Sequence, residues 1–285
     1  MIQIGSYNNL KVIRTSPEGI ILSDGEQEVL LPEHQVTRKV EMGDELFAFV
    51  YQNKEGDAIA TTKRPYACAG DFAFLKLVAK TEDGGFLDLG IDKDIFIPSN
   101  QRQPLVVGHR YIVYLFLDKI DGKLTATTWL DDHIQKDPAG LEAGDEVSLL
   151  ISEISELGYS AVINNKYVGL LYRDEVYEDL QIGQTCTGYI TKIREENNLI
   201  DLSLRQQGFD FILTSKDEVL DVLKQNQVIP LGDKSSPEEI RDQLRMSKKA
   251  FKKIIGMLYK ERLITIADYE IRLAAPAEQT EDKQA

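Results

Sequence analysis

The side chains that could perform chemistry are few and lie far apart in the sequence. The three histidines, His34, His109 and His133, have no partner at the spacing of a metal site or a catalytic pair. Acidic runs at 92–94 and 131–132 could hold Mg²⁺, but no nucleophile or base accompanies them, which favours surface solubility. No phosphate-binding glycine loop occurs. We therefore expect no catalytic residue, no metal and no cofactor.

A basic segment near the C-terminus could contact a charged ligand. The chain as a whole has a formal net charge of −14, which argues against a simple basic nucleic-acid binder. Residues 241–262 nevertheless hold eight basic and only two acidic residues, so the positive charge is local. On a helix over 248–260 the apolar residues would form one buried stripe and leave the opposite face basic. An ordinary solvated face is the alternative to nucleic-acid contact. The residues expected to bind are Arg245, Lys249, Lys252, Lys253 and Lys260.

The sequence around this basic segment predicts a small α+β domain. Capping-box spacings at Ser215 and Ser236 should start its first and second helices, and Ser247 should start the third. Two short β segments follow, at 263–266 and 270–273. Three helices and a hairpin resemble a winged helix.

The predicted winged helix extends over residues 210–274. The polar tail at 275–285 is expected to be disordered.

Glycines recur at intervals of 65 to 75 residues through the rest of the chain. The three sets are Gly5, Gly70 and Gly144; Gly19, Gly85 and Gly158; and Gly43, Gly108 and Gly183. Between them, short apolar stretches separated by Gly, Asn and Asp turns predict five strands per unit. A five-stranded Greek-key barrel suits such a unit because closure removes exposed sheet edges. We expect a mainly β chain with barrels over 1–64, 65–134 and 140–207.

The third unit resembles an S1 RNA-binding domain, an OB-fold barrel for single-stranded RNA. The resemblance depends on Gly158-Tyr159, on the strand at 168–172 and on the closing strand at 200–204. Three S1-like barrels followed by a winged helix are in turn similar to the conserved virulence factor B family of bacterial RNA-binding proteins, over about residues 1–275. That resemblance implies RNA binding with effects on gene expression, and no catalysis.

The resemblance also indicates which residues of the third barrel would bind. S1-like barrels stack bases on aromatic side chains within a positively charged groove. Tyr159 and Tyr172 are the expected stacking residues, although each could instead belong to the barrel core. The expected phosphate contacts are Lys166, Arg173, Lys192 and Arg194.

The other two barrels depart from this pattern. The second offers Phe86, with Ile97 where the family often has His, and the strand alternation is expected to turn Phe96 inward. The first has Ile20 at the position of Tyr159 and Leu31 at the position of Tyr172. We therefore expect the first barrel to be divergent and a doubtful binder.

The N-terminal sequence and the cysteines indicate the cellular compartment of the protein. The N-terminal residues lack the basic and apolar regions of a signal peptide, and no apolar run approaches a membrane span. The two cysteines, Cys68 and Cys186, lie too far apart for a metal or redox motif and fit a reducing, cytoplasmic compartment. We expect a single-stranded RNA-binding protein, a post-transcriptional regulator that uses the third barrel and the winged helix. A DNA-binding transcriptional regulator and a protein-interaction scaffold remain alternatives, and the oligomeric state is open.

Overall fold

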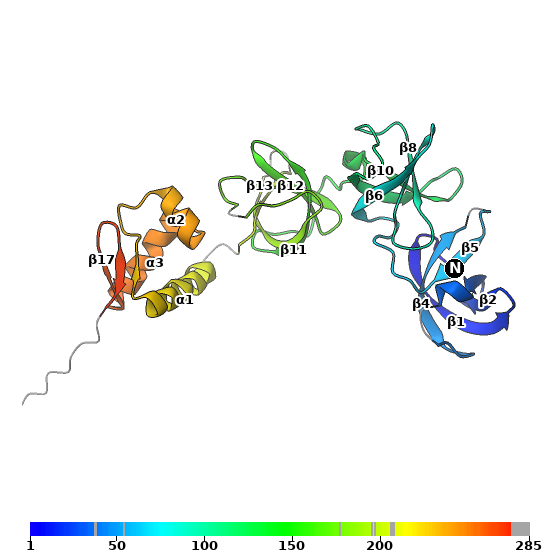
Figure 1. Ribbon diagram of the computed structural model, residues 1–285, viewed down its shortest axis with the longest axis horizontal. Coiled ribbons are helices and arrows are strands. Elements are labelled where there is room, and N and C mark those ends of the chain that lie inside the picture. The colour runs from blue at the N-terminus through cyan, green and yellow to red at the C-terminus, as the bar shows by residue number, and fades with distance from the viewer. Residues whose placement is uncertain are drawn as a thin grey trace, which may run out of the picture.

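The computed structural model contains three closed five-stranded barrels and a C-terminal winged helix, in chain order (Figure 1). It describes residues 1–36, 39–53, 55–176, 178–194, 196, 198–205 and 209–274, with backbone only for 209–214. The predicted fold class is confirmed. The tail, for which we expected disorder, lies outside the described residues.

The three barrels have the same strand arrangement. Barrel 1 consists of β1 (Ser6–Ser16), β2 (Gly19–Ser23), β3 (Glu28–Pro32), β4 (Glu45–Gln52) and β5 (Ala58–Thr61), and barrel 2 of β6 (Phe72–Lys80), β7 (Gly84–Leu87), β8 (Ile95–Pro98), β9 (Arg110–Leu117) and β10 (Leu124–Thr127). Barrel 3 consists of β11 (Glu146–Ile154), β12 (Gly158–Ile163), β13 (Tyr167–Tyr172), β14 (Thr185–Ile193) and β15 (Ile200–Ser203). Short 3-10 helices cover Glu33–Gln35 and Leu130–Asp132. In every barrel the third and fifth strands pair in parallel and so close the ring.

The glycine before the fourth strand has the same backbone conformation and the same hydrogen bond in all three barrels. Gly43, Gly108 and Gly183 have φ values of +91°, +91° and +84°. Their N–H groups donate to Val12, Leu77 and Ile151, each at the irregularity of a first strand, over 2.9, 2.8 and 2.8 Å. The predicted period therefore corresponds to one local structure that occurs three times.

A second glycine lets the second strand approach the third. An added Cβ at Gly19, Gly84 or Gly158 would lie 2.3, 2.1 or 2.0 Å from a carbonyl oxygen of the third strand. Only glycine allows this approach. The residue of barrel 2 that corresponds to Gly158 is thus Gly84, whereas we had expected Gly85. The sequence comparison was wrong by one residue at this point.

The winged-helix domain consists of three helices and a three-stranded sheet. Its elements are α1 (Phe209–Asn226), β16 (Val228–Ile229), α2 (Pro237–Leu244), α3 (Lys248–Lys260), β17 (Ile264–Ile266) and β18 (Ile271–Leu273). The capping box at Ser236 and the N-cap at Ser247 are confirmed. The strand β16, which pairs with β18, is too short to have been recognised in the sequence.

The predicted start of the first helix is wrong. Ser215 lies inside α1, with a side chain that is 3% exposed, and the helix begins six residues earlier at Phe209. No Gly or Pro between these two positions stops the helix from extending toward its N-terminus. A capping-box spacing within a longer helix is therefore not a boundary.

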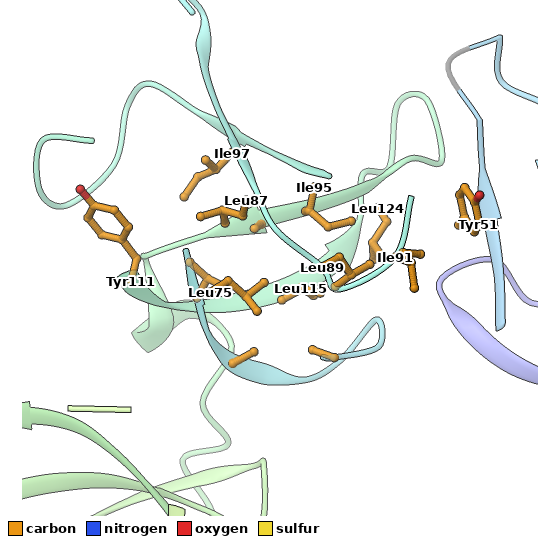
Figure 2. Packing of buried hydrophobic residues seen from close by; sticks show 14 of the residues in the cluster. Tyr51, Leu75, Leu87, Leu89, Ile91, Ile95, Ile97, Tyr111, Leu115 and Leu124 are labelled. Carbon is orange, nitrogen blue, oxygen red and sulfur yellow. The ribbon is translucent and has the colours of Figure 1, made fainter. Parts of the chain in front are cut away.

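Barrel 1 packs on barrel 2 through the outer side of its last two strands. Alternate residues of β4 point into the core of barrel 1. The intervening Phe49 and Tyr51, together with Ile59 of β5, instead join one hydrophobic cluster with the core of barrel 2. Figure 2 shows part of this cluster, with Tyr51 of barrel 1 beside the residues of barrel 2. The second half of β4, from Ala48 to Tyr51, and β5 from Ile59 to Thr61 are consequently buried on both faces.

Polar contacts reinforce this joint. Gln35, which is 1% exposed, hydrogen-bonds to Asp92 of barrel 2 and accepts from the hydroxyl of Thr61 over 2.6 Å. Lys63 forms an ion pair with the same aspartate over 2.7 Å. The joint between barrels 2 and 3 is also polar, because the side-chain oxygen of Asn165 accepts a hydrogen bond from the N–H of Phe72 over 2.6 Å.

Within the described residues, no helix is both long enough and apolar enough to cross a membrane.

Substitution of the close-contact glycine tests the barrel architecture. In Gly158→Ala the new Cβ would collide with a backbone carbonyl at a φ of +154°, so barrel 3 should lose at least about 2 kcal/mol of unfolding free energy. Urea unfolding followed by circular dichroism measures this loss. Gly256→Ala on α3 is the control, since nothing lies within 4 Å of its added Cβ and alanine favours a helix. Equal stability of the two variants would contradict the proposed strand contact.

Candidate nucleic-acid interface

In an OB-fold barrel the ligand-binding face lies over the second and third strands. In barrel 1 this region is partly covered, because Leu30 and Ile59, which pair across β3 and β5, pack against the barrel 2 cluster. Leu31, one of the positions compared with the family, is fully buried inside the barrel. No aromatic side chain of β2 or β3 is available there for stacking.

Barrel 2 presents an aromatic pair on the same face. Phe86 of β7 lies opposite Phe96 of β8, and their ring centroids are 5.7 Å apart at an interplanar angle of 60°. Ile95 and Ile97 point into the core, at 2% and 0% exposure, so Phe96 between them points outward. The expectation that Phe96 points inward is therefore wrong. The one-residue shift explains the difference, because a strand reverses its face at each residue.

In barrel 3 the ring of Tyr159 is buried. Its exposed fraction is 5%, and it belongs to the core cluster of the barrel. The guanidinium of Arg173 lies 5.4 Å from the ring centroid and donates a hydrogen bond to the carbonyl of Ser155 over 2.8 Å. A ligand that approaches this point would therefore meet the exposed Arg173 before Tyr159.

Tyr172 is half-buried and belongs to a polar network on this face. Its hydroxyl accepts from Arg194 and donates to the carboxylate of Asp201 over 3.3 Å. Arg194 also forms an ion pair with Asp201 over 3.1 Å, and this contact raises the pKa of the guanidinium.

The strand registers place Pro32 of barrel 1 and Pro98 of barrel 2 at the position that Tyr172 occupies in barrel 3, and not Leu31 and Ile97.

The remaining basic residues of barrel 3 lie at two separate places. Lys192 is exposed and pairs in register with Asp201, so it belongs to the face that carries Tyr172. Lys166 lies at the opposite end of the β12–β13 hairpin, six residues or about 20 Å along the strand. The structure therefore does not bring Lys166 together with the other predicted residues of this face.

Acidic groups surround part of the same face. Burial raises the pKa of Glu175, and the neighbouring carboxylates of Asp174 and Asp201 raise it further. Asp201 occupies a position in the closing strand that we had not singled out. Its place opposite Leu170 of β13 follows from the strand register, which is the signal that could have identified it.

The basic face of α3 has the predicted geometry. Phe251, Ile254, Ile255 and Leu258 are buried, which turns the lysines of the opposite side to solvent. Lys249, Lys253 and Lys260 are exposed and form no ion pair with any described residue. Lys252 pairs with Asp233 over 2.9 Å. Arg245 is exposed at the C-cap of α2, with a φ of +51°.

The exposed side chains of the barrels and of α3 are of the kinds that contact planar and charged ligands. Across the described ranges, no group of three or more His, Cys, Asp or Glu side chains could hold a metal ion. The candidate binding groups are an aromatic pair on barrel 2, a mixed tyrosine–arginine face on barrel 3 and a lysine face on α3. Planar bases and phosphates are the ligands that such groups recognise.

Comparison with known proteins agrees with these domains. Residues 217–273 match the CvfB-like winged helix domain, and residues 4–63 match the S1 domain. The S1 match thus falls on barrel 1, the barrel that we expected to be divergent. These two domain types support a nucleic-acid-binding protein.

Relatives extend over nearly the whole chain. An uncharacterized protein, YitL of Bacillus subtilis, is 27% identical over 271 residues, which cover 90% of this chain and 89% of the relative. Conserved virulence factor B of Staphylococcus epidermidis is 25% identical and covers 95% of this chain and 94% of its own. A solved multidomain protein with nucleic acid binding domains from Streptococcus pneumoniae is 20% identical, covers 95% of this chain and 98% of its own, and has a TM-score of 0.41. The chain is thus similar over nearly its whole length to conserved virulence factor B proteins, and it contains a CvfB-like winged helix domain and an S1 domain.

Proposed function

We propose that this protein is a cytoplasmic post-transcriptional regulator that binds single-stranded RNA through barrel 3 and the winged helix and catalyses no reaction. The observation that carries the proposal is the basic face of α3. Three lysines, Lys249, Lys253 and Lys260, are exposed there in a chain whose net charge is −14. A local positive surface of this kind attracts phosphates despite the overall repulsion.

The open face of barrel 3 supports a single strand as the ligand. Tyr172 is half-buried, so part of its ring can contact a base, while Arg173 and Lys192 are exposed beside it for phosphates. Arg194 forms an ion pair with Asp201 and a hydrogen bond to Tyr172. Its main role is therefore to orient Tyr172, and its contact with an RNA phosphate is secondary. Single-stranded ligands suit OB-fold barrels because their unpaired bases can stack on side chains.

A direct competition distinguishes RNA from DNA. Labelled single-stranded RNA, incubated with the protein and Mg²⁺, should be bound and remain intact, and unlabelled duplex DNA should compete poorly. Gel retardation and denaturing electrophoresis of the same samples measure both results. Stronger competition by the duplex would instead favour a DNA-binding regulator that uses α3 as a recognition helix. Degradation of the RNA that a single carboxylate substitution abolishes would contradict the absence of catalysis.

The basic face of α3 is tested by removing its charge. Replacing Lys249, Lys253 and Lys260 with Ala should weaken binding to many RNA sequences alike, because phosphate contacts carry no base information. The plot of log affinity against log salt should flatten by about 0.7 for each lost contact. Thermal stability should change little, since all three side chains are exposed.

A matched control separates local charge from net charge. Replacing the exposed Lys11, Lys76 and Lys119 of the first two barrels with Ala changes the net charge equally. If both triple variants lose the same affinity, α3 has no special role and the winged helix is better interpreted as a protein-docking domain.

Barrel 3 is tested at Tyr172. Tyr172→Ala should weaken RNA binding by about 1–3 kcal/mol if a base stacks on the ring, and Tyr172→Phe should retain most of the affinity. Tyr189→Ala is the control, because Tyr189 pairs with Glu146 on other strands of the same barrel. Fluorescence anisotropy measures the affinities. Tyr159→Ala is a poor test, because loss of this buried ring would also destabilise the barrel. Equal affinities of the Tyr172→Ala and Tyr189→Ala variants would show that bases do not stack on Tyr172.

A further inference from the structure

A cleft of about 670 Å³ lies where barrel 1 meets the open face of barrel 2. One wall comes from the end of β4, at Tyr51, Gln52 and Asn53, and the other comes from β7, β8 and β10. A volume of this size is typical of sites for small planar ligands. The cleft exists because barrel 1 is fixed beside barrel 2 by the shared hydrophobic cluster (Figure 2).

The floor of the cleft is aromatic. Phe86 and Phe96, the outward pair of barrel 2, both line it, and Thr125 of the closing strand lies next to Phe96 in register. Neither phenylalanine is fully buried. Their ring faces and edges are therefore available for stacking by a flat, apolar surface.

The wall from barrel 1 carries a polar atom without a partner. The side-chain oxygen of Gln52 is buried, and no donor among the described residues hydrogen-bonds to it. A buried acceptor in this state costs free energy, and a rotation of the Gln52 side chain, which lines the cleft, would bring the oxygen to an N–H group of a ligand. Asn53 beside it is already engaged with Asp57, since its side-chain oxygen accepts the N–H of Asp57 over 2.8 Å.

The cleft is lined by three carboxylates, those of Asp92, Asp94 and Asp121, and by two lysines, Lys93 and Lys123. Asp92 pairs with Lys63 over 2.7 Å, and Asp121 pairs with Lys123 over 3.1 Å. Paired carboxylates attract a cation weakly, so the cleft is better suited to a neutral ring than to an amine. The Lys123 side chain is 54% exposed and can meet a phosphate outside the cleft.

We infer that this cleft binds one nucleobase, stacked on Phe86 and Phe96 and hydrogen-bonded to Gln52. The inference rests on the proposed function, since a base of single-stranded RNA is the occupant that the barrels imply. A free nucleotide has the same ring chemistry and is distinguished by the test. The site adds a base-binding position outside barrel 3 and the winged helix, built from two barrels together.

Two variants of the full chain test the site. Phe96→Ala removes half of the aromatic floor, and Gln52→Leu removes the buried acceptor while retaining the volume. Each should weaken binding of a 12-nucleotide oligoadenylate by roughly tenfold. Gln52→Leu should be at least as thermally stable as the wild type, because it removes a buried polar atom without a partner. Phe47→Ala, an exposed aromatic position outside the cleft, should leave the affinity unchanged.

Ultraviolet cross-linking with peptide mapping locates the occupant. The wild type should cross-link to oligoadenylate at the peptide that contains Phe86 and Phe96, and Gln52→Leu should reduce this cross-link. Competition by excess AMP would identify a free nucleotide as the occupant, and failure of AMP to compete would identify RNA. Cross-links confined to barrel 3 and α3, with unchanged affinity of both variants, would overturn the cleft and leave the proposed function standing. AMP cross-linked in the cleft without any RNA binding would support the cleft and overturn the proposed function, and no binding of either would overturn both.

Discussion

The packing of barrel 1 on barrel 2 determines what each barrel can present to a ligand. Phe49, Tyr51 and Ile59 are apolar side chains on the outer surface of barrel 1, and their burial removes them from water at the joint. The same contact covers part of the binding face of barrel 1 and creates a wall beside the face of barrel 2. Barrel 3 meets barrel 2 partly through the amide of Asn165, which lies at the end of the β12–β13 hairpin away from Tyr172. Three copies of one fold thus have three different surfaces.

The charges of the barrels and of the winged helix also differ. Residues 1–208, which contain the barrels, hold 20 basic and 33 acidic residues, whereas residues 241–262 around α3 hold eight basic and two acidic residues. Within barrel 3, Asp201 engages both Arg194 and Tyr172, so this face combines opposite charges and is not a plain positive groove. Affinity for a polyanion must therefore come from a few exposed cations, while the barrels contribute shape and stacking.

Sequence alone predicted the fold better than the site. The glycine period located all three barrels, because Gly43, Gly108 and Gly183 occupy the same left-handed conformation. The amphipathic pattern also located α3, since its buried and exposed faces follow directly from helical geometry. The binding faces were harder to predict, because the assignment depends on a register that must be correct to one residue. Choosing Gly85 in place of Gly84 hid the outward position of Phe96. The burial of Tyr159 and the pairing of Arg194 depend on contacts between strands distant in sequence, which spacing does not reveal.

The double-sided burial of the second half of β4 and most of β5 has a consequence for synthesis on the ribosome. Barrel 1 emerges first, and domains generally fold in that order. Its own core can form as soon as β5 is complete, but its outer apolar strip has no cover until β10 of barrel 2 has been made. During that interval the nascent chain exposes a hydrophobic surface of the kind that chaperones bind and that promotes aggregation. We therefore expect barrels 1 and 2 to mature as one folding unit, and a truncation between them to leave that surface exposed.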